Sequence, residues 1–206
     1  TVLNDGDAAG LAEARIGNLQ DCGCGATFVL GTGVGLSLTS NGSLISTWNL
    51  KDYLRWPTLG ETQADSKQKQ YQNDILRHGI SSLVQNLGSA VNFVAKASQL
   101  LELLEEDGVQ VFEVLEAGHH EELQDLFASY CREIAILIYN LQSLVRLEKV
   151  TIGGGISSQP LLLEEINHQY KSLMDESGEQ RFSLVEIQAA RYHNSSNLLG
   201  AVCHFK

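Results

Sequence analysis

The residues best suited to chemistry lie in Thr27–Gly35, where a short apolar run leads into a glycine-rich turn that contains one hydroxyl. Gly31, Gly33 and Gly35 allow positive φ and let the backbone come close to a ligand. Successive amides of such a turn can bind one anion while the Thr32 hydroxyl donates from the side. A phosphate site is one interpretation. A tight hairpin between two antiparallel strands is the other, and a hairpin lined with free amides satisfies both.

A candidate general base precedes this turn in the chain. Asn4 and Asp5 stand before an Ala-rich stretch, and both residue types are good N-caps, so the pattern predicts a capped helix. A carboxylate beside a helix start and near a phosphate turn can also accept a proton from a substrate hydroxyl.

A second glycine turn follows a predicted strand at 149–152. Gly153, Gly154 and Gly155 separate this strand from a predicted helix over Pro160–Met174. Backbone without side chains at a strand end lets a flat or charged ligand approach the next helix, an arrangement typical of nucleotide sites. A plain turn explains the same three glycines.

The elements that must position these residues follow from periodicity and turn signals. The sequence predicts a helix, three antiparallel strands, a helical block, and then strand, helix, strand and helix. Asn41-Gly42 is the strongest hairpin signal, and 50–72 is an irregular excursion. The predicted strands are 27–30, 34–39, 43–48, 149–152 and 183–187, and the predicted helices are 83–104, ended by Gly108, then 109–116, 120–147, 160–174 and 194–204.

Composition limits the classes of function. The chain has 206 residues, of which 43% are hydrophobic and 19% charged, and its net charge is −11. This acidic balance argues against nucleic acid or an anionic membrane as a partner. No apolar stretch reaches the roughly 20 residues of a membrane span, and no signal peptide is present. We therefore expect a soluble cytoplasmic protein.

The cysteines do not predict a metal site. Cys22 and Cys24 form a CGCG stretch, but no second pair of Cys or His follows at the spacing of a structural zinc site. Reduced thiols in a glycine-rich turn are the alternative. His119 and His120 adjoin each other in an acidic helical stretch and are interpreted as part of a solvated face.

Five motifs follow one another along the chain: LNDGDAAGLAE (3–13), LGTGVGLSLTSNGSL (30–44), IYNLQSL (138–144), KVTIGGGIS (149–157) and NSSNLLGAVCHF (194–205). Taken in this order, they resemble the ROK family of bacterial sugar kinases and repressors over nearly the whole chain. The resemblance implies an α/β fold of the actin-like ATPase (ribonuclease H-like) type, with a mixed sheet of three antiparallel and two further strands. It also implies that 1–25 form the hinge and first helix of the C-terminal half of a two-domain kinase, and 26–206 its C-terminal domain.

The activity implied by this resemblance is ATP-dependent phosphorylation of a hexose hydroxyl, with Mg²⁺ on the nucleotide. Asp5 matches the catalytic base and Asn4 the neighbour that holds the sugar. The second phosphate motif matches Gly31, Thr32 and Gly33. The glycines beside the adenosine match Gly153, Gly154 and Gly155. Such an enzyme acts by positioning and charge neutralisation around an in-line transfer.

The sequence departs from the family pattern at three places. No DxGGT-type phosphate motif is present, so we expect these residues to be a C-terminal portion that lacks the N-terminal domain. We expect this portion alone not to catalyse phosphorylation. Gly60-Glu61 fits the family's sugar motif only with an insertion, which makes Glu61 a candidate sugar contact. The cysteine run of many members is absent between Ala64 and Leu87, so no structural zinc is expected.

The family also contains repressors that use the kinase-like body as a sugar sensor. Asp5 favours a kinase, because a pure sensor has less need of a base, whereas the altered sugar motif favours a sensor or a substrate other than glucose. A third alternative is an isolated interaction domain with no ligand, which is favoured only if both glycine turns are plain hairpins. The resemblance further suggests a homodimer.

Overall fold

The computed structural model describes residues 3–45, 88–177 and 183–204. Its five strands form one mixed sheet in the order β3-β2-β1-β4-β5. The antiparallel part comprises β1 (Cys24–Leu30), β2 (Val34–Ser40) and β3 (Ser43–Ile45). The parallel part adds β4 (Lys149–Gly154) beside β1, and β5 (Glu186–Ala189) beside β4. The predicted sheet of three antiparallel and two further strands is therefore confirmed.

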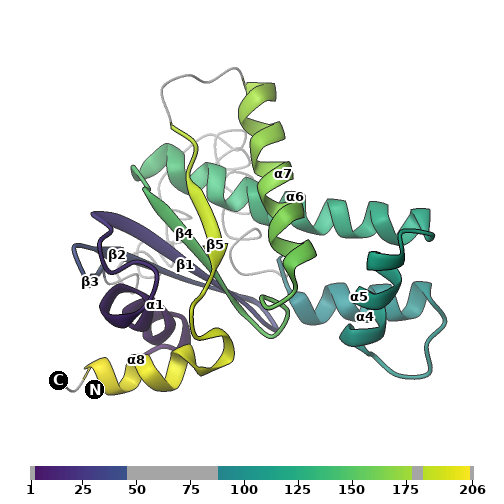
Figure 1. Ribbon diagram of the computed structural model, residues 1–206, viewed down its shortest axis with the longest axis horizontal. Coiled ribbons are helices and arrows are strands. Elements are labelled where there is room, and N and C mark those ends of the chain that lie inside the picture. Colours follow the sequence, from purple (N-terminus) through teal and green to yellow (C-terminus); the bar gives the residue numbers. More distant parts are fainter. Residues whose placement is uncertain (1–2, 46–87, 178–182, 205–206) are drawn as a thin grey trace, which may run out of the picture.

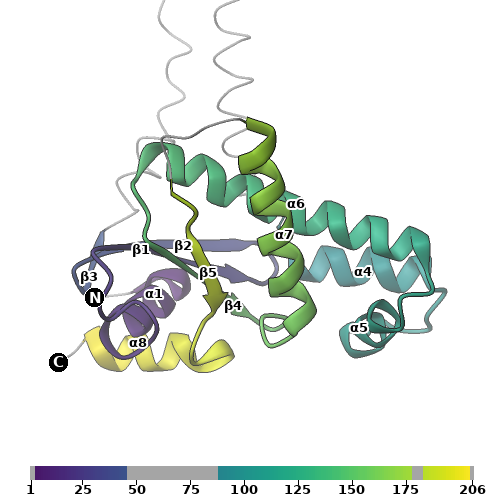
Figure 2. The ribbon, with the colours of Figure 1, turned by 45° about the horizontal axis from the view of Figure 1, so that its top comes forward.

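Helices cover both faces of this sheet (Figures 1 and 2). One face carries α1 (Asp5–Ile16) and α8 (Ser196–His204), the latter preceded by the short 3-10 helix η2 (His193–Ser195). The other face carries α6 (Glu121–Leu144) and α7 (Pro160–Ser177). Beyond the sheet, α4 (Ala90–Leu100) runs along the first half of α6, and α5 (Gly108–Ala117) lies beside α4 and crosses its direction (Figures 1 and 2).

The main hydrophobic core lies between the sheet and α6 and α7. Alternation along the strands places the large apolar side chains of β1 and β4 in this core, where burying each contributes roughly 1.5–3 kcal/mol. Phe93 of α4 extends the core toward that helix and stacks on Tyr130, with ring centroids 4.6 Å apart. Buried members of this core include Phe28, Leu30, Ile134, Ile138, Ile152, Leu162 and Ile166.

The opposite face of the sheet is made of small side chains that let α1 come close. Thr27 of β1 and Thr151 of β4 hydrogen-bond through their hydroxyls at 2.9 Å in the interior. A Cβ at Gly10 would overlap the Ser37 side chain of β2, and a Cβ at Gly200 of α8 would overlap the Ala8 carbonyl. Helix α1 is therefore held tightly between the sheet and α8, and residues 6–14 are all buried.

The hairpin between β2 and β3 has the turn that its sequence predicts. Asn41 and Gly42 have φ of 48° and 75°, and positive φ at both central residues is the signature of a two-residue type I′ turn. The second strand of this hairpin was expected to reach Trp48. Residues 46–48, like the predicted excursion at 50–72, lie outside the described residues.

The predicted helix 83–104 is wrong at both ends of its described part. Ser89 is extended and caps α4, so the helix begins only at Ala90. Helix α4 ends at Leu100, Glu102 has a φ of 53°, and Leu104 is fully exposed. Gly108 begins α5 instead of ending α4, because the Asp107 carboxylate accepts hydrogen bonds from two backbone amides of the next turn.

Helix α6 also ends earlier than predicted, at Leu144 rather than 147. The side chain of Gln142 accepts a hydrogen bond from the Leu147 amide at 2.8 Å, and the Leu144 side chain is 83% exposed. At the other end, His120 is an N-cap, since its Nδ1 accepts from the Leu123 amide at 3.2 Å. This is a more specific role than the solvated face expected for it.

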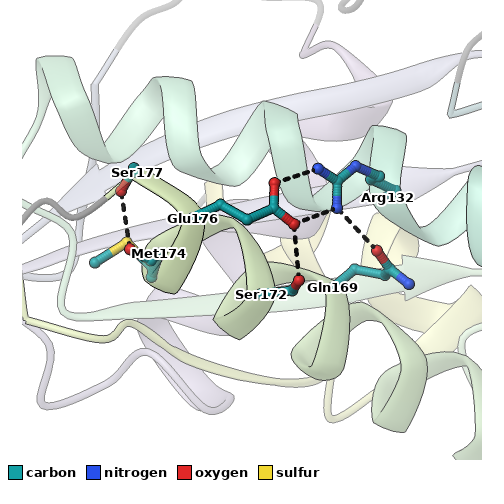
Figure 3. A network of polar contacts seen from close by, with 6 residues as sticks. All are labelled: Arg132, Gln169, Ser172, Met174, Glu176 and Ser177. Carbon is teal, nitrogen blue, oxygen red and sulfur yellow. Dashed lines mark hydrogen bonds and ion pairs between the residues drawn. The ribbon is translucent and has the colours of Figure 1, made fainter.

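A polar network joins α6 to α7 on the surface (Figure 3). The Arg132 guanidinium pairs with both Glu176 carboxylate oxygens, at 3.2 and 2.7 Å. Ser172 donates to Glu176 at 2.9 Å, and Gln169 accepts from Arg132 at 3.4 Å. The paired Arg132 guanidinium and the Ser172 hydroxyl lower the pKa of Glu176. Because both side chains are exposed to solvent, this ion pair contributes little to the free energy of unfolding.

Candidate functional site

The two glycine-rich stretches lie at the carboxyl ends of neighbouring strands. The prediction that all three glycines of the second stretch follow the strand is wrong, because Gly153 and Gly154 are the last two residues of β4 and only Gly155 lies in the turn after it. This strand end and the turn after it are together called the Gly153–Gly155 turn. Leu30, the last residue of β1, pairs with Gly154, the last residue of the parallel strand β4. Gly154 has a φ of 104°, and a Cβ there would overlap the Leu30 carbonyl oxygen. Only glycine fits this position. The carboxyl ends of neighbouring strands are where open α/β sheets bind ligands.

The Gly31–Gly33 turn exposes backbone rather than using left-handed geometry. None of Gly31, Gly33 and Gly35 has a left-handed φ, so the expectation that they serve by positive φ is wrong. A Cβ at Gly31 or Gly33 would meet no atom within 4 Å. Glycine here leaves the turn open on its outer side.

The same turn has groups that fit a phosphate. The Gly31 amide donates to the Gly33 carbonyl at 3.0 Å, so it closes the turn and cannot bind an anion at the same time. The Thr32 side chain is exposed. The amides of Thr32 and Gly33 and the Thr32 hydroxyl are thus the donors that the turn can offer. A phosphate oxygen can approach them because no side chain stands at Gly31 or Gly33.

The start of α4 lies against this turn, which sequence reasoning missed. The Ser89 hydroxyl donates to the Gly31 carbonyl at 3.3 Å and accepts from the Asn92 amide at 3.1 Å. The Val91 amide also donates to Gly31, at 3.4 Å. Ser89 before an Ala-rich stretch is a recognisable N-cap signal, but nothing in the sequence connects it to Gly31. The positive end of the α4 dipole therefore lies beside the turn.

The start of α1 reaches the hairpin that carries this turn. Gly6 and Gly35 lie in contact, and a Cβ on either would be 3.4 Å from the Cα of the other. Asn4 is the N-cap predicted for this helix, accepting from the Gly6 amide through Oδ1 at 2.9 Å. The exposed Asp5 carboxylate also accepts from that amide, through Oδ1 at 2.8 Å. Asn4 Nδ2 and Asp5 Oδ2 remain on the side chains as groups for a ligand.

Three of the four predicted groups of site residues therefore meet in one region. Asn4 and Asp5, the 31–33 turn and the 153–155 turn all lie at or beside the carboxyl ends of β1 and β4. Gly155 is exposed, and a Cβ there would meet no atom within 4 Å. Glu61 lies outside the described residues.

A buried carboxylate fixes the far end of α1. The Glu13 side chain is fully buried, and its two oxygens accept from the amides of Asn18 and Arg191, each at 2.9 Å. Burial raises the pKa of Glu13 above its ordinary value, while the two amides and the Arg191 charge oppose that rise. Tyr192 adds a hydrogen bond from its hydroxyl to the Ile16 carbonyl at 2.9 Å. The helix that carries Asp5 is thereby tied to the segment after β5.

The described residues contain no group of three or more His, Cys, Asp or Glu side chains that could hold a metal ion. Cys22 and Cys24 are free thiols, and burial, aided by the Glu148 charge, raises the pKa of both. The segment Ala64–Leu87, on which the zinc prediction depends, lies outside the described residues, so that expectation stays a prediction.

A family model matches residues 62–206, and its description is the ROK family. The chain belongs to the ROK family. A curated β-glucoside kinase of Listeria monocytogenes is 28% identical over 211 residues, covering 99% of this chain. The chain spans 64% of the length of that ROK relative.

Solved ROK structures share the fold. A ROK family protein from Streptococcus pneumoniae, in complex with sucrose, superposes with a TM-score of 0.71 at 22% identity, covering 98% of this chain and 64% of that one. A ROK glucokinase from Streptomyces griseus, in complex with glucose and AMPPNP, has a TM-score of 0.63 at 18% identity, covering 98% of this chain and 66% of that one. The predicted actin-like ATPase fold is therefore confirmed. No helix in the described residues is both long and apolar enough to cross a bilayer.

Proposed function

We propose that the protein containing this chain is an ATP-dependent sugar kinase that transfers the γ-phosphoryl group to a hexose hydroxyl. The observation that carries the proposal is the meeting of a carboxylate with two open glycine turns. Asp5 lies beside the hairpin whose turn is Gly31–Gly33, and Gly154 pairs with the residue before that turn. Phosphoryl transfer needs positioned phosphates, neutralised charge and a base near the attacking hydroxyl.

Each part of this site has a distinct role. Asp5 accepts the proton of the attacking hydroxyl through Oδ2, since Oδ1 is held by the Gly6 amide. Asn4 donates to the sugar through Nδ2, because its Oδ1 caps the helix. The amides of Thr32 and Gly33 and the Thr32 hydroxyl hold the transferring phosphate. Mg²⁺ bound with the nucleotide supplies further charge neutralisation.

The adenosine lies at the Gly153–Gly155 turn in this proposal. Gly154 admits no side chain, whereas Gly155 is exposed with open space where a side chain would stand. An exposed backbone surface of this kind suits the flat face of a nucleoside. The adenosine then lies on β4 while the phosphates lie on the neighbouring turn after β1.

The substrate is a hexose or a hexose glycoside. Glu61 is the proposed further sugar contact, and the β-glucoside kinase relative makes β-glucosides the first candidates to test. The sequence contains no DxGGT-type phosphate motif, so residues 1–206 alone are proposed not to catalyse phosphorylation. Residues 1–25 act as the hinge and first helix, and 26–206 as the C-terminal domain. The working protein is proposed to be a cytoplasmic homodimer.

The experiment is sugar-dependent ADP production by the product of the complete open reading frame, over a panel of free hexoses and β-glucosides. Turnover with one sugar class supports the kinase and names its substrate. Sugar binding without turnover, together with specific DNA binding, would support a sugar-sensing regulator instead. The absence of any sugar or nucleotide binding would overturn both.

A further inference from the structure

His193 has a backbone conformation that residues other than glycine uncommonly adopt. Its φ is 45°, and it is one of three non-glycine residues with positive φ among the described residues. Asn41, another of the three, belongs to a hairpin turn that requires such geometry. His193 lies in η2 between β5 and α8. Unfavourable backbone geometry of this kind persists where the surroundings impose it, and it concentrates at functional sites.

The residues before His193 are fixed one after another. The Ala190 amide donates to the Ile152 carbonyl at 2.8 Å, which extends the pairing of β5 with β4. The Arg191 amide donates to the buried Glu13 carboxylate, and the Tyr192 hydroxyl to the Ile16 carbonyl, each at 2.9 Å. The chain therefore enters His193 with little freedom.

The residues after His193 are fixed as well. The Ser195 amide donates to the Tyr192 carbonyl at 2.8 Å, and the Ser196 hydroxyl to the His193 carbonyl at 2.9 Å. Gly200 then packs α8 against Ala8 of α1. Since the chain is fixed on both sides of His193, its neighbours impose the unfavourable φ and determine where the imidazole lies.

The imidazole is oriented from the Gly153–Gly155 turn. The buried Ser157 hydroxyl lies 3.3 Å from His193 Nδ1 and donates to the Gly154 carbonyl at 2.8 Å. A hydroxyl has one proton, so Ser157 can only accept from Nδ1. In the neutral ring, this leaves Nε2 as a hydrogen-bond acceptor on an exposed side chain.

We propose that His193 is a nucleotide-contacting residue, whose Nε2 accepts a hydrogen bond from the nucleoside bound at the Gly153–Gly155 turn. The inference rests on the proposed function, because it places adenosine at this turn. A nucleoside offers two kinds of donor that suit an acceptor nitrogen, the ribose hydroxyls and the exocyclic amine of adenine. His193 thereby selects the nucleoside, while Ser157 is a positioning residue that acts through the imidazole.

The experiment measures binding of ATP, 2′-deoxy-ATP and GTP by calorimetry, using the product of the complete open reading frame. His193→Asn is the main variant, because Asn tolerates a left-handed backbone but is too short to replace the imidazole. His193→Gly is the second, since glycine has no backbone penalty there. Tyr192→Phe is the matched control, because it removes a hydrogen bond from the same segment without touching the ring.

The expected result is a loss of ATP affinity of about threefold to tenfold in both His193 variants, the size of one hydrogen bond. Their urea midpoints should not fall below that of Tyr192→Phe, which should keep the parent's ATP affinity. If a ribose hydroxyl is the donor, the parent's preference for ATP over 2′-deoxy-ATP should shrink in His193→Asn. If adenine is the donor, the preference for ATP over GTP should shrink instead.

Two outcomes would overturn the inference, and they can be told apart. Parent-like ATP affinity and unchanged nucleotide preferences in both His193 variants would show that the residue only completes a turn, with the proposed function intact. A parent protein that binds no nucleotide would remove the proposed function and this inference together.

Discussion

Leu30 and Gly154 pair across the parallel strands β1 and β4, and Gly154 has no room for a side chain because the Leu30 carbonyl occupies that space. This contact brings the two glycine turns to neighbouring positions. It also distinguishes the three glycines of the second turn. Gly153 has only ordinary contacts and Gly155 none, so the demand for glycine falls on the middle residue.

Gly154→Ala should therefore destabilise the fold, and Gly155→Ala should not. The first substitution combines a φ of 104° with overlap against Leu30, and we expect a loss of about 1–3 kcal/mol or more in the free energy of unfolding. The second adds a methyl group to open space. Urea denaturation of the two variants beside the parent checks this, and equal midpoints for the pair would contradict the geometry.

Gly33→Ala tests whether the first turn is glycine for a ligand or for the fold. A Cβ there meets nothing within 4 Å and the φ is not left-handed. The free energy of unfolding of the variant should therefore stay within about 0.5 kcal/mol of that of the parent. A methyl group beside the turn amides should raise the KM for ATP. A destabilised variant, or one with unchanged kinetics, would argue against the phosphate interpretation.

The sequence predicts the strands and turns of the site better than the long-range contacts that hold them in place. Strand alternation, the Asn41-Gly42 turn and the glycines after 30 are local signals, and each marks an element that the structure contains. The glycines after 152 mark the end of β4 less exactly, because Gly153 and Gly154 still belong to the strand. The contacts of Ser89 with Gly31 and of Ser157 with His193 join residues 58 and 36 positions apart. Local periodicity and propensity carry no information about such pairs.

Two local predictions were wrong because a different local signal outweighed the apolar spacing. Leu104 continues the spacing of the helix before it, yet the chain has already left that helix and Asp107 caps the next one. Leu144 likewise continues the spacing of α6 but lies exposed at its last position. Apolar periodicity shows which positions share a face and says little about where a helix ends.

The buried Glu13 carboxylate should give the protein a pH-dependent stability of definite sign. Burial raises its pKa in the folded protein above the ordinary value of 4.5, so the folded state binds the proton more tightly than the unfolded chain. The contribution of Glu13 to the free energy of unfolding should then fall as the pH rises from below 4.5 through the raised pKa.

Glu13→Gln isolates this contribution, because the amide does not titrate. The stability of the parent relative to the variant should decline as the pH rises from below 4.5 through the raised pKa of Glu13. Urea midpoints of both proteins across this range provide the measurement. A relative stability that grows with pH would show that the two amides and Arg191 outweigh burial, and that the pKa of Glu13 is lowered instead.

The most direct test of the whole account is the turnover of Asp5→Asn beside Asp125→Asn, both made in the product of the complete open reading frame and assayed with the sugar that the parent uses. Asp5 begins α1, whose Gly6 contacts the hairpin that carries the Gly31–Gly33 turn, whereas Asp125 is another exposed aspartate, on α6. If Asp5 is the base, its variant should lose roughly 10²–10⁴-fold in kcat. The KM for ATP should change little, and Asp125→Asn should match the parent. Parent-like kcat in Asp5→Asn would contradict the assignment of the site.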